Sequence, residues 1–351
     1  MRLGLHLGYW TSARDLPGHL ALVREAETLG YDSVWAAEAY GSDTATTLAW
    51  LAGQTERIGL GAGVFQIPGR SPASTAMTAA SLDAISGGRF RLGLGVSGPQ
   101  VSEGWHGVRF GRPLARTREY IEVVRTALAR RTVTHDGEFY PLPLPDGPGK
   151  PLKLAVRPVR DRIPIYLAAV GPRNLELAGE IADGWLAVFL APEHAAEHLG
   201  HIRSGAARVG RDLDGFDVVP TVPLVVGDDV SACADLVRGY AALYVGGMGS
   251  REQNFYNQLA VRMGYAEAAA EVQEHFLAGR YQAAYAAVPE EFIDATSLLG
   301  PPERIAERIR RYADAGVTTL SVTVHGEHLD ARLDSLRTLV RSAENAGVLG
   351  G

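Results

Sequence analysis

The sequence predicts a parallel (β/α)8 barrel, also called a TIM barrel, and two observations support this fold class. Short apolar runs alternate eight times with longer amphipathic segments along the 351 residues, as expected when helices cover a parallel sheet. Several helical segments end in glycine just before the next apolar run, as in "ETLGYDSVW" and "ADAGVTTLSV". Glycine suits the left-handed residue that follows a helix. A doubly wound open sheet is the alternative that this alternation leaves open.

The predicted strands are short and apolar, as expected for strands covered on both faces. They run over residues 2–8, 32–35, 58–64, 90–96, 163–168, 184–188, 216–226 and 318–324. The amphipathic segments between and after them predict helices over residues 19–29, 44–54, 73–85, 114–129, 174–182, 193–209, 302–315 and 329–346.

Two segments do not fit the alternation. Residues 131–162 are rich in proline and glycine, and residues 246–295 are long and helical. We interpret the second segment as a helical insertion between strand 7 and helix 8. Such insertions usually lie at the catalytic face of a barrel or at an oligomer contact. Because neither a repeat nor a linker divides the chain, we expect a single domain over residues 1–351.

The composition is that of a soluble globular protein, with 46% hydrophobic and 21% charged residues. A net charge of −6 without a basic stripe argues against a nucleic-acid partner. The single cysteine, Cys233, excludes an internal disulfide and fits a reducing cytoplasm. No apolar run is long enough to span a membrane, and the N-terminus lacks a signal-peptide pattern. We therefore expect a cytoplasmic protein with a small-molecule partner and neither a membrane nor a nucleic-acid partner.

The third strand raises a specific question, because its sequence "GLGAGVFQIPGRSP" contains Gly59, Gly61 and Gly63. Glycine weakens a strand and leaves no side chain to pack. One explanation is a bulge, and the other is a flat ligand lying against bare backbone.

In a barrel, functional residues gather at the C-terminal ends of the strands. The unusual residues that follow strands 2 and 4 are Glu38, Tyr40, Asp43, Ser97, Gly98, Glu103, Trp105 and His106. Glu38 suits a base, a hydrogen-bond acceptor or an ion-pair partner, and the ion pair is the default for a lone carboxylate. No HExxH motif or Cys/His spacing accompanies His106, so no metal site is predicted.

The segment "AVGPRN" follows strand 5. Proline suits a first helical position, so Pro172 predicts a helix start. The free amides near Gly171 and Arg173 would then form an anion site at the helix N-terminus. An ordinary strand-to-helix turn explains the same residues equally well. GxGxxG and P-loop motifs are absent, so neither a dinucleotide nor a nucleoside triphosphate is indicated.

Three runs together resemble the luciferase-like monooxygenase superfamily. They are "YDSVWAAEAYGSD", "TERIGLGAGVFQIPGRSPASTAMTAASLDAISGGRFRLGLGVSGPQVSEGWHG" and "AAVGPRNLELAGEIADGW". The resemblance extends through "NFYNQLAVRMGY" and "LAGRYQAAYAAVPEEFID" and covers nearly the whole chain. It is strongest to the branch of oxidoreductases that use the deazaflavin coenzyme F420. This resemblance implies a bacterial-luciferase-like barrel.

The resemblance also implies an answer to the glycine question. In this family a bulge in strand 3 carries a non-prolyl cis peptide, here Gly63–Val64, on which the deazaflavin ring rests. The neighbouring Phe65 is included in the implied cofactor site. Glu38 would face the polar edge of the ring, and Ser97 and Gly98 would contact the ribityl chain or the phosphate. The phosphate would be held by Val170, Gly171, Pro172 and Arg173.

The sequence departs from the family at one position. The sugar-phosphate and secondary-alcohol dehydrogenases of this branch carry a catalytic histidine where this chain has Ala39. Without that base, hydride transfer to an activated C=C or C=N bond is favoured over alcohol oxidation. Tyr40 and Glu103 are the expected proton donors, and His106 would act only if its loop folds over the ring.

Three other functions remain compatible with the sequence. They are an FMN-dependent monooxygenase on the same scaffold, a non-catalytic flavin-binding relative, and a phosphate-binding barrel without a flavin. The aromatic insertion and the family resemblance also predict a homodimer.

Overall fold

The computed structural model describes residues 1–326 and 328–349. Within these residues, ten strands form one sheet in the order β10-β1-β2-β3-β5-β6-β7-β8-β9, and β10 also pairs with β8. β4 pairs beside β5 beyond the end of β3, and β9 extends from β8, so eight strands close the barrel. All these pairings are parallel. The predicted barrel is confirmed, and the open sheet is excluded.

The eight predicted strands are all present, with ends that differ by at most two residues. The third is interrupted at the bulge, so that Phe65 and Gln66 form a separate short strand. β9 was not predicted. The strands are β1 Arg2–His6, β2 Ser33–Ala36, β3 Gly59–Ala62, β4 Phe65–Gln66, β5 Phe90–Gly95, β6 Ile165–Ala168, β7 Gly184–Val188, β8 Asp217–Val226, β9 Leu298–Gly300 and β10 Thr319–Val324.

The outer helices follow the predicted segments, and prolines at their starts set several boundaries. They are α1 Leu16–Thr28, α2 Thr44–Ala52, α3 Pro72–Ile85, α5 Pro113–Leu128, α6 Pro172–Ile181, α7 Ala195–Arg208, α13 Pro302–Asp314 and α14 Leu329–Asn345. The short helix α4 (Pro99–Gly104) and the helix α8 (Val230–Ala242) were not predicted.

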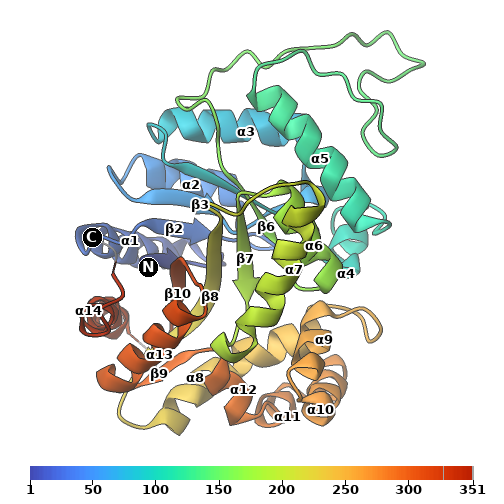
Figure 1. Ribbon diagram of the computed structural model, residues 1–351. Helices are drawn as coiled ribbons and strands as arrows, with labels where there is room; N and C mark the ends of the chain where they lie inside the picture. Colours follow the sequence, from blue (N-terminus) through green and yellow to red (C-terminus); the bar gives the residue numbers. More distant parts are fainter. Residues whose placement is uncertain (327, 350–351) are drawn as a thin grey trace.

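The helical insertion differs from the prediction in two respects. It begins at α8, before residue 246, and it precedes α13, which is the seventh predicted helix and not the eighth. The insertion continues through a π-helical turn at Leu243–Gly247 and helices α9 (Phe255–Arg262), α10 (Ala266–Leu277), α11 (Tyr281–Ala286) and α12 (Glu290–Ala295). These helices gather at one end of the barrel (Figure 1).

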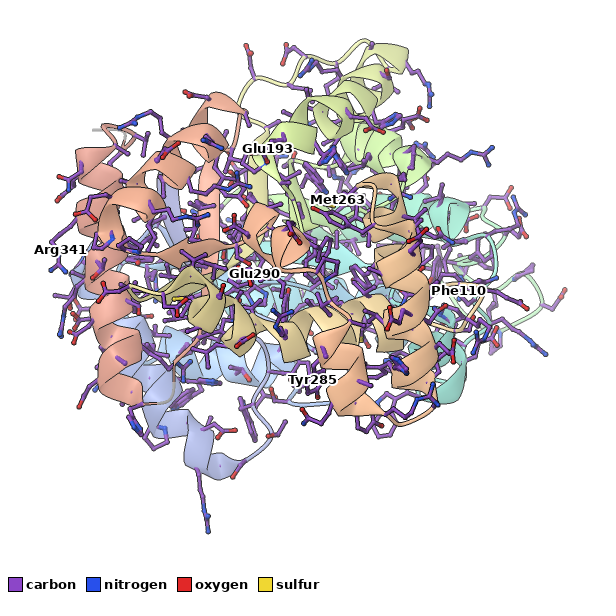
Figure 2. All side chains as sticks on the ribbon, turned by 90° about the horizontal axis from the view of Figure 1, so that it is seen from below. Phe110, Glu193, Met263, Tyr285, Glu290 and Arg341 are labelled. Atoms are coloured by element: carbon purple, nitrogen blue, oxygen red, sulfur yellow. The ribbon has the colours of Figure 1, made fainter. Side chains whose placement is uncertain are left out.

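The insertion has its own apolar core, in which Phe189, Val237, Leu259 and Phe292 are buried. Figure 2 views this side and shows the insertion, with Met263, Tyr285 and Glu290 labelled, across the barrel. The insertion is therefore packed on the barrel. No helix among the described residues is long and apolar enough to cross a membrane.

The interior of the barrel explains one of the strand 3 glycines. The buried Trp35 ring lies 5.1 Å from the Tyr166 ring, edge to face. A Cβ on Gly61 would come within 2.1 Å of the Trp35 ring. The flat group against this glycine therefore belongs to the protein itself. Only the last glycine of the series, Gly63, borders the cavity described next.

Candidate active site

A cavity of about 1130 Å³ lies at the C-terminal ends of the barrel strands. Pockets for single drug-sized ligands commonly span roughly 300–1,000 Å³. Of the sequence-predicted site residues, those on its wall are Glu38, Tyr40, Gly63, Val64, Ser97, Gly98, Val170, Gly171, Pro172 and Arg173. The topology thus brings together residues from four predicted loops, as barrel strands do at this face.

The bulge between β3 and β4 forms one part of the wall. The peptide bond between Gly63 and Val64 is cis, at the position that the family resemblance implied. A Cβ on Gly63 would lie 3.3 Å from the His6 Nε2 atom. In the direction that a side chain would take, the backbone of Gly63 therefore already lies close to His6. Gly63 also lines the cavity. A flat ring can approach it without meeting a side chain from residue 63.

A second part of the wall is the N-terminus of α6, which starts at Pro172 as predicted. The Gly171 cap has no side chain, and a Cβ there would meet nothing within 4 Å. Within residues 1–326 and 328–349, the amides of Gly171 and Arg173 donate no hydrogen bond, and the Arg173 guanidinium has no ion-pair partner. Free amides at a helix N-terminus, with a cation beside them, fit a phosphate group.

Glu38 lines the cavity, but its carboxylate is fully engaged by the protein. Oε1 accepts from the Gln66 amide at 3.1 Å and pairs with Arg70, and Oε2 accepts from the Thr44 amide at 3.2 Å. The Arg70 side chain is 15% exposed and also pairs with Asp43. The ion-pair role expected for a lone carboxylate is therefore the one that the structure has.

Three of the expected residues do not reach the cavity wall. The Phe65 ring is fully buried on the other side of the bulge, with the Arg70 guanidinium 4.6 Å from its centre. Glu103 accepts a 2.9 Å hydrogen bond from the Phe110 amide and so holds the loop after α4. His106 lies behind Gln66, with its Nε2 atom 2.7 Å from Gln66 Oε1. His106 itself is therefore not on the cavity wall, although the preceding residue of its loop, Trp105, is.

His6 is a wall residue that the sequence reasoning missed. Its Nδ1 atom accepts from the Gly8 amide at 3.1 Å, and its Nε2 atom lies 3.3 Å from the Gly63 carbonyl oxygen. These partners fix the tautomer, because Nε2 must carry the proton in order to donate to a carbonyl. Burial lowers the pKa of His6 to about 4, although the hydrogen bond to Gly63 opposes this shift. The imidazole is therefore neutral at pH 7.

The insertion supplies an aromatic part of the wall, which sequence reasoning also missed. Tyr240 lies on α8 and Tyr244 on the π-helical turn, with ring centres 4.8 Å apart. The Tyr256 ring lies 4.8 Å from Tyr244. All three pack around Phe189, a residue in the left-handed region with φ of 51°. A bulky residue rarely adopts this conformation, and such strain often accompanies a functional site.

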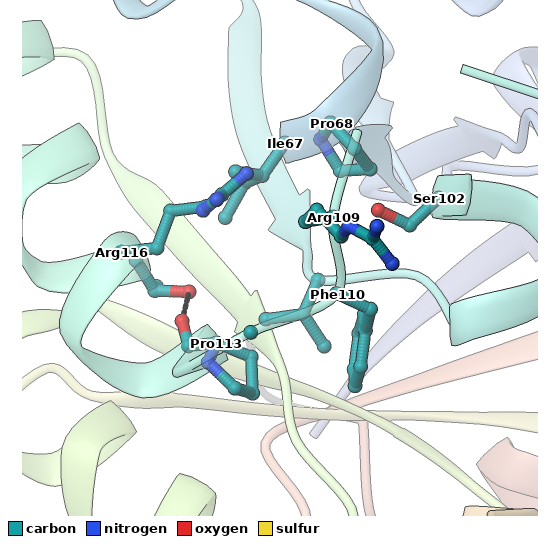
Figure 3. Close-up of a pocket in the computed structure, with 10 residues that line it drawn as sticks. Ile67, Pro68, Ser102, Arg109, Phe110, Pro113 and Arg116 are labelled. Carbon is teal, nitrogen blue, oxygen red and sulfur yellow. Dashed lines mark hydrogen bonds between the residues drawn. The ribbon is translucent and has the colours of Figure 1, made fainter. Parts of the chain in front are cut away.

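A second, much smaller pocket lies next to the cavity, between the α4–α5 loop and the segment after β4 (Figure 3). Its volume is about 10 Å³, which is room for about one water molecule. The hydrogen bond from Thr117 Oγ1 to the Pro113 carbonyl, drawn in Figure 3, lies in the first turn of α5, next to this pocket. This pocket cannot hold an organic ligand. In the described part of the chain, no group of acidic, histidine or cysteine residues could hold a metal ion.

Comparison with known proteins is consistent with this geometry. The family model for luciferase-like monooxygenases matches residues 4–319. A Mycobacterium tuberculosis protein with the provisional name coenzyme F420-dependent oxidoreductase is 44% identical over 330 residues, covering 92% of this chain and 95% of that protein. The 5,10-methylenetetrahydromethanopterin reductase of Archaeoglobus fulgidus is 32% identical, covering 84% and 86%. The solved coenzyme F420-dependent tetrahydromethanopterin reductase of Methanopyrus kandleri superposes with a TM-score of 0.82 at 25% identity, covering 97% and 98%.

Proposed function

This chain belongs to the luciferase-like monooxygenase family, and on that premise we propose that it is a coenzyme F420-dependent oxidoreductase. In this proposal it transfers a hydride from the reduced cofactor to a small organic substrate and so reduces an activated C=C or C=N bond. The names of the Mycobacterium tuberculosis relative and of the solved Methanopyrus kandleri reductase, which both include coenzyme F420, support the choice of this cofactor.

The observation that carries the direction of the reaction is that, among the residues that the structure describes, the cavity wall offers proton donors but no free base. Ala39, at the position of the dehydrogenase histidine, contributes only a methyl group. The acceptor nitrogen of His6 is occupied by the Gly8 amide, and both oxygens of Glu38 are engaged. Alcohol oxidation needs a base at the hydroxyl, and such a group typically contributes 10²–10⁴-fold. Reduction needs only a hydride and a proton.

The cavity wall fits the cofactor in two places. The backbone of the Gly63–Val64 bulge, which has no side chain at residue 63, suits the flat ring, and the α6 N-terminus with Arg173 suits its phosphate. Ser97 and Gly98, which also line the cavity, lie on the proposed path between them. When bound, the deazaflavin supplies a hydride at its C5 atom. The protein would orient the ring, shield it from water and hold a proton near the substrate.

Tyr40 is the retained candidate among the expected proton donors, because it lines the cavity whereas Glu103 and His106 do not. Tyr9 lines the same wall, with its ring 6.5 Å from that of Tyr40. Burial, followed by the neighbouring Tyr40, raises the pKa of Tyr9. A tyrosine with a raised pKa keeps its proton and therefore suits a donor better than a base.

Absorbance at 420 nm tests the proposal, because it follows oxidation of the reduced cofactor. We expect cofactor oxidation with enones and imines and little cofactor reduction with secondary alcohols. Tyr40→Phe should lower the rate in the reductive direction. Efficient alcohol oxidation would contradict the proposed direction, and loss of that oxidation in His106→Ala alone would identify a base that this proposal overlooks.

We further propose that the protein is a cytoplasmic homodimer. The exposed apolar side chains on the insertion include Val261, Leu277 and Tyr281, the last 51% exposed. Surfaces of this kind often mark contacts. The single thiol, Cys233, is free and buried, which fits a reducing compartment. Light scattering at micromolar concentration tests the assembly, and a monomer would contradict it.

A further inference from the structure

The part of the cavity wall contributed by the insertion has no charged side chain. Its main members are Tyr240, Leu243, Tyr244, Met248, Phe255 and Tyr256. Elsewhere on the wall, His6 is neutral at pH 7, Glu38 is paired with Arg70, and Arg173 is at the α6 N-terminus. A charged group on a ligand beside the insertion would therefore have no partner there, and burying it would be costly.

The aromatic groups of this wall are rigidly supported. The rings of Tyr240, Tyr244 and Tyr256 pack around the buried Phe189. The side-chain amide of Asn254 donates to the Tyr244 and Val245 carbonyls at 3.0 Å each and so holds the π-helical turn in place. A fixed set of aromatic rings suits a flat, conjugated ligand, because ring contacts add to the burial of apolar area.

The same wall supplies neutral hydrogen-bond donors. In the described residues, the hydroxyls of Tyr240, Tyr244 and Tyr256 make no hydrogen bond to the backbone or to a charged side chain. Burial raises the pKa of Tyr256 to about 12 and those of the other two further. All three keep their protons at neutral pH. The Tyr240 and Tyr244 hydroxyls hydrogen-bond each other, so Tyr256 and one hydroxyl of that pair are left to donate to a carbonyl oxygen.

The mouth of the cavity also carries aromatic, uncharged side chains. Tyr40 and Trp105 line it and are 54% and 66% exposed. Large exposed aromatic side chains at the rim of a cavity are suited to an apolar ligand that enters from water.

We infer that the substrate is an uncharged, flat, conjugated carbonyl compound, which lies against the aromatic wall of the insertion and accepts a hydrogen bond from a tyrosine hydroxyl through its carbonyl oxygen. This inference rests on the proposed function and names its substrate class. It excludes substrates that would place a carboxylate or a phosphate against the aromatic wall of the insertion.

Three enones of matched shape test the inference. They are benzalacetone, its 4-carboxylate and the methyl ester of that acid, which controls for size. Binding is measured by quenching of tryptophan fluorescence, because Trp35 and Trp105 line the cavity. The protein is the full chain with oxidised F420, so that no turnover occurs. We expect the ketone and the ester to bind, and the carboxylate to bind on the order of 100-fold more weakly.

A gain-of-function variant makes the test independent of lost stability. Leu243→Lys introduces a cation into the wall, and its long side chain can remain partly solvated. Leu243→Met is the matched control. We expect the carboxylate to bind at least about tenfold more tightly to the lysine variant than to the methionine variant.

Equal binding of the carboxylate and the ester to the unmodified chain would overturn the inference, as would failure of all three enones to bind. No gain in Leu243→Lys would overturn the assignment of the wall. Failure of the proposed function is separate: the charge discrimination would persist in the binding assay, while reduced F420 would not be oxidised by the ester.

Discussion

Replacing Asn254 by alanine tests how the insertion shapes the cavity. The side chain of Asn254 is 2% exposed and lies at the start of α9. Its amide group donates to the carbonyls of Tyr244 and Val245, and its oxygen accepts from the amides of Tyr256 and Asn257. One side chain thus caps α9 and also binds the π-helical turn that carries Tyr244.

The magnitude follows from these contacts. Loss of an N-cap residue costs about 1 kcal/mol. The Val245 carbonyl keeps a second donor, the Asn257 side chain at 3.1 Å, but the Tyr244 carbonyl loses its side-chain donor. Leaving a buried carbonyl unsatisfied costs about 1–3 kcal/mol. We therefore expect Asn254→Ala to lower the free energy of unfolding by about 2–4 kcal/mol.

Urea denaturation of the two proteins measures this change. Gln253→Ala is the matched control, since that residue is exposed and its side chain makes no hydrogen bond in the described structure. It should change stability by less than about 0.5 kcal/mol. Asn254→Ala should also raise the KM for the organic substrate more than the Kd for F420, because the turn lies on the insertion side of the cavity. A loss below about 1 kcal/mol, or a Kd that rises as much as the KM, would refute the reasoning.

Three further predictions concern the rest of the cavity. Gly63→Val should weaken F420 binding more than it lowers stability, because its side chain would press on His6 and Trp35 and so displace the backbone on which the ring is proposed to rest; titration with F420 and urea denaturation compare the two effects. As pH falls from 6.5 to about 4, the unfolded chain protonates residue 6 while folded His6 stays neutral, so stability should fall by up to about 3 kcal/mol. His6→Gln should remove this part of the pH-dependent loss of stability. Identical pH–stability curves for the two proteins would contradict the lowered pKa of His6. Glu103→Gln and His106→Ala should keep the rate of enone reduction. A 10²-fold or larger loss of that rate in either variant would identify the replaced residue as a proton donor after all.

The fold was predictable because the signals that determine it are local. Alternation of apolar strands with amphipathic helices identified the barrel strands, and Pro172 marked the start of α6. The short helix α4, with six residues, is too brief to have a clear period. Tyr240 and Tyr244 are four residues apart, a spacing that places side chains on one helix face. This spacing is visible in the sequence, but it does not show that the two tyrosines line the cavity.

The site was predictable only where a residue follows a strand directly. His6 was missed because the first strand was extended to Gly8, which placed the histidine inside it. The partner of Glu38 could not be inferred, since Arg70 is 32 residues away along the chain. The same holds for Gly61, whose missing side chain makes room for Trp35. Such long-range pairings depend on how the strands are closed into a barrel.

The most direct test of the central claim is equilibrium binding of the purified protein to F420 and to FMN. The proposed F420-dependent oxidoreductase should bind F420 tightly and FMN weakly or not at all, and Arg173→Ala should weaken the binding of F420. Tight binding of FMN without binding of F420 would contradict the account and would support a flavin monooxygenase on the same barrel.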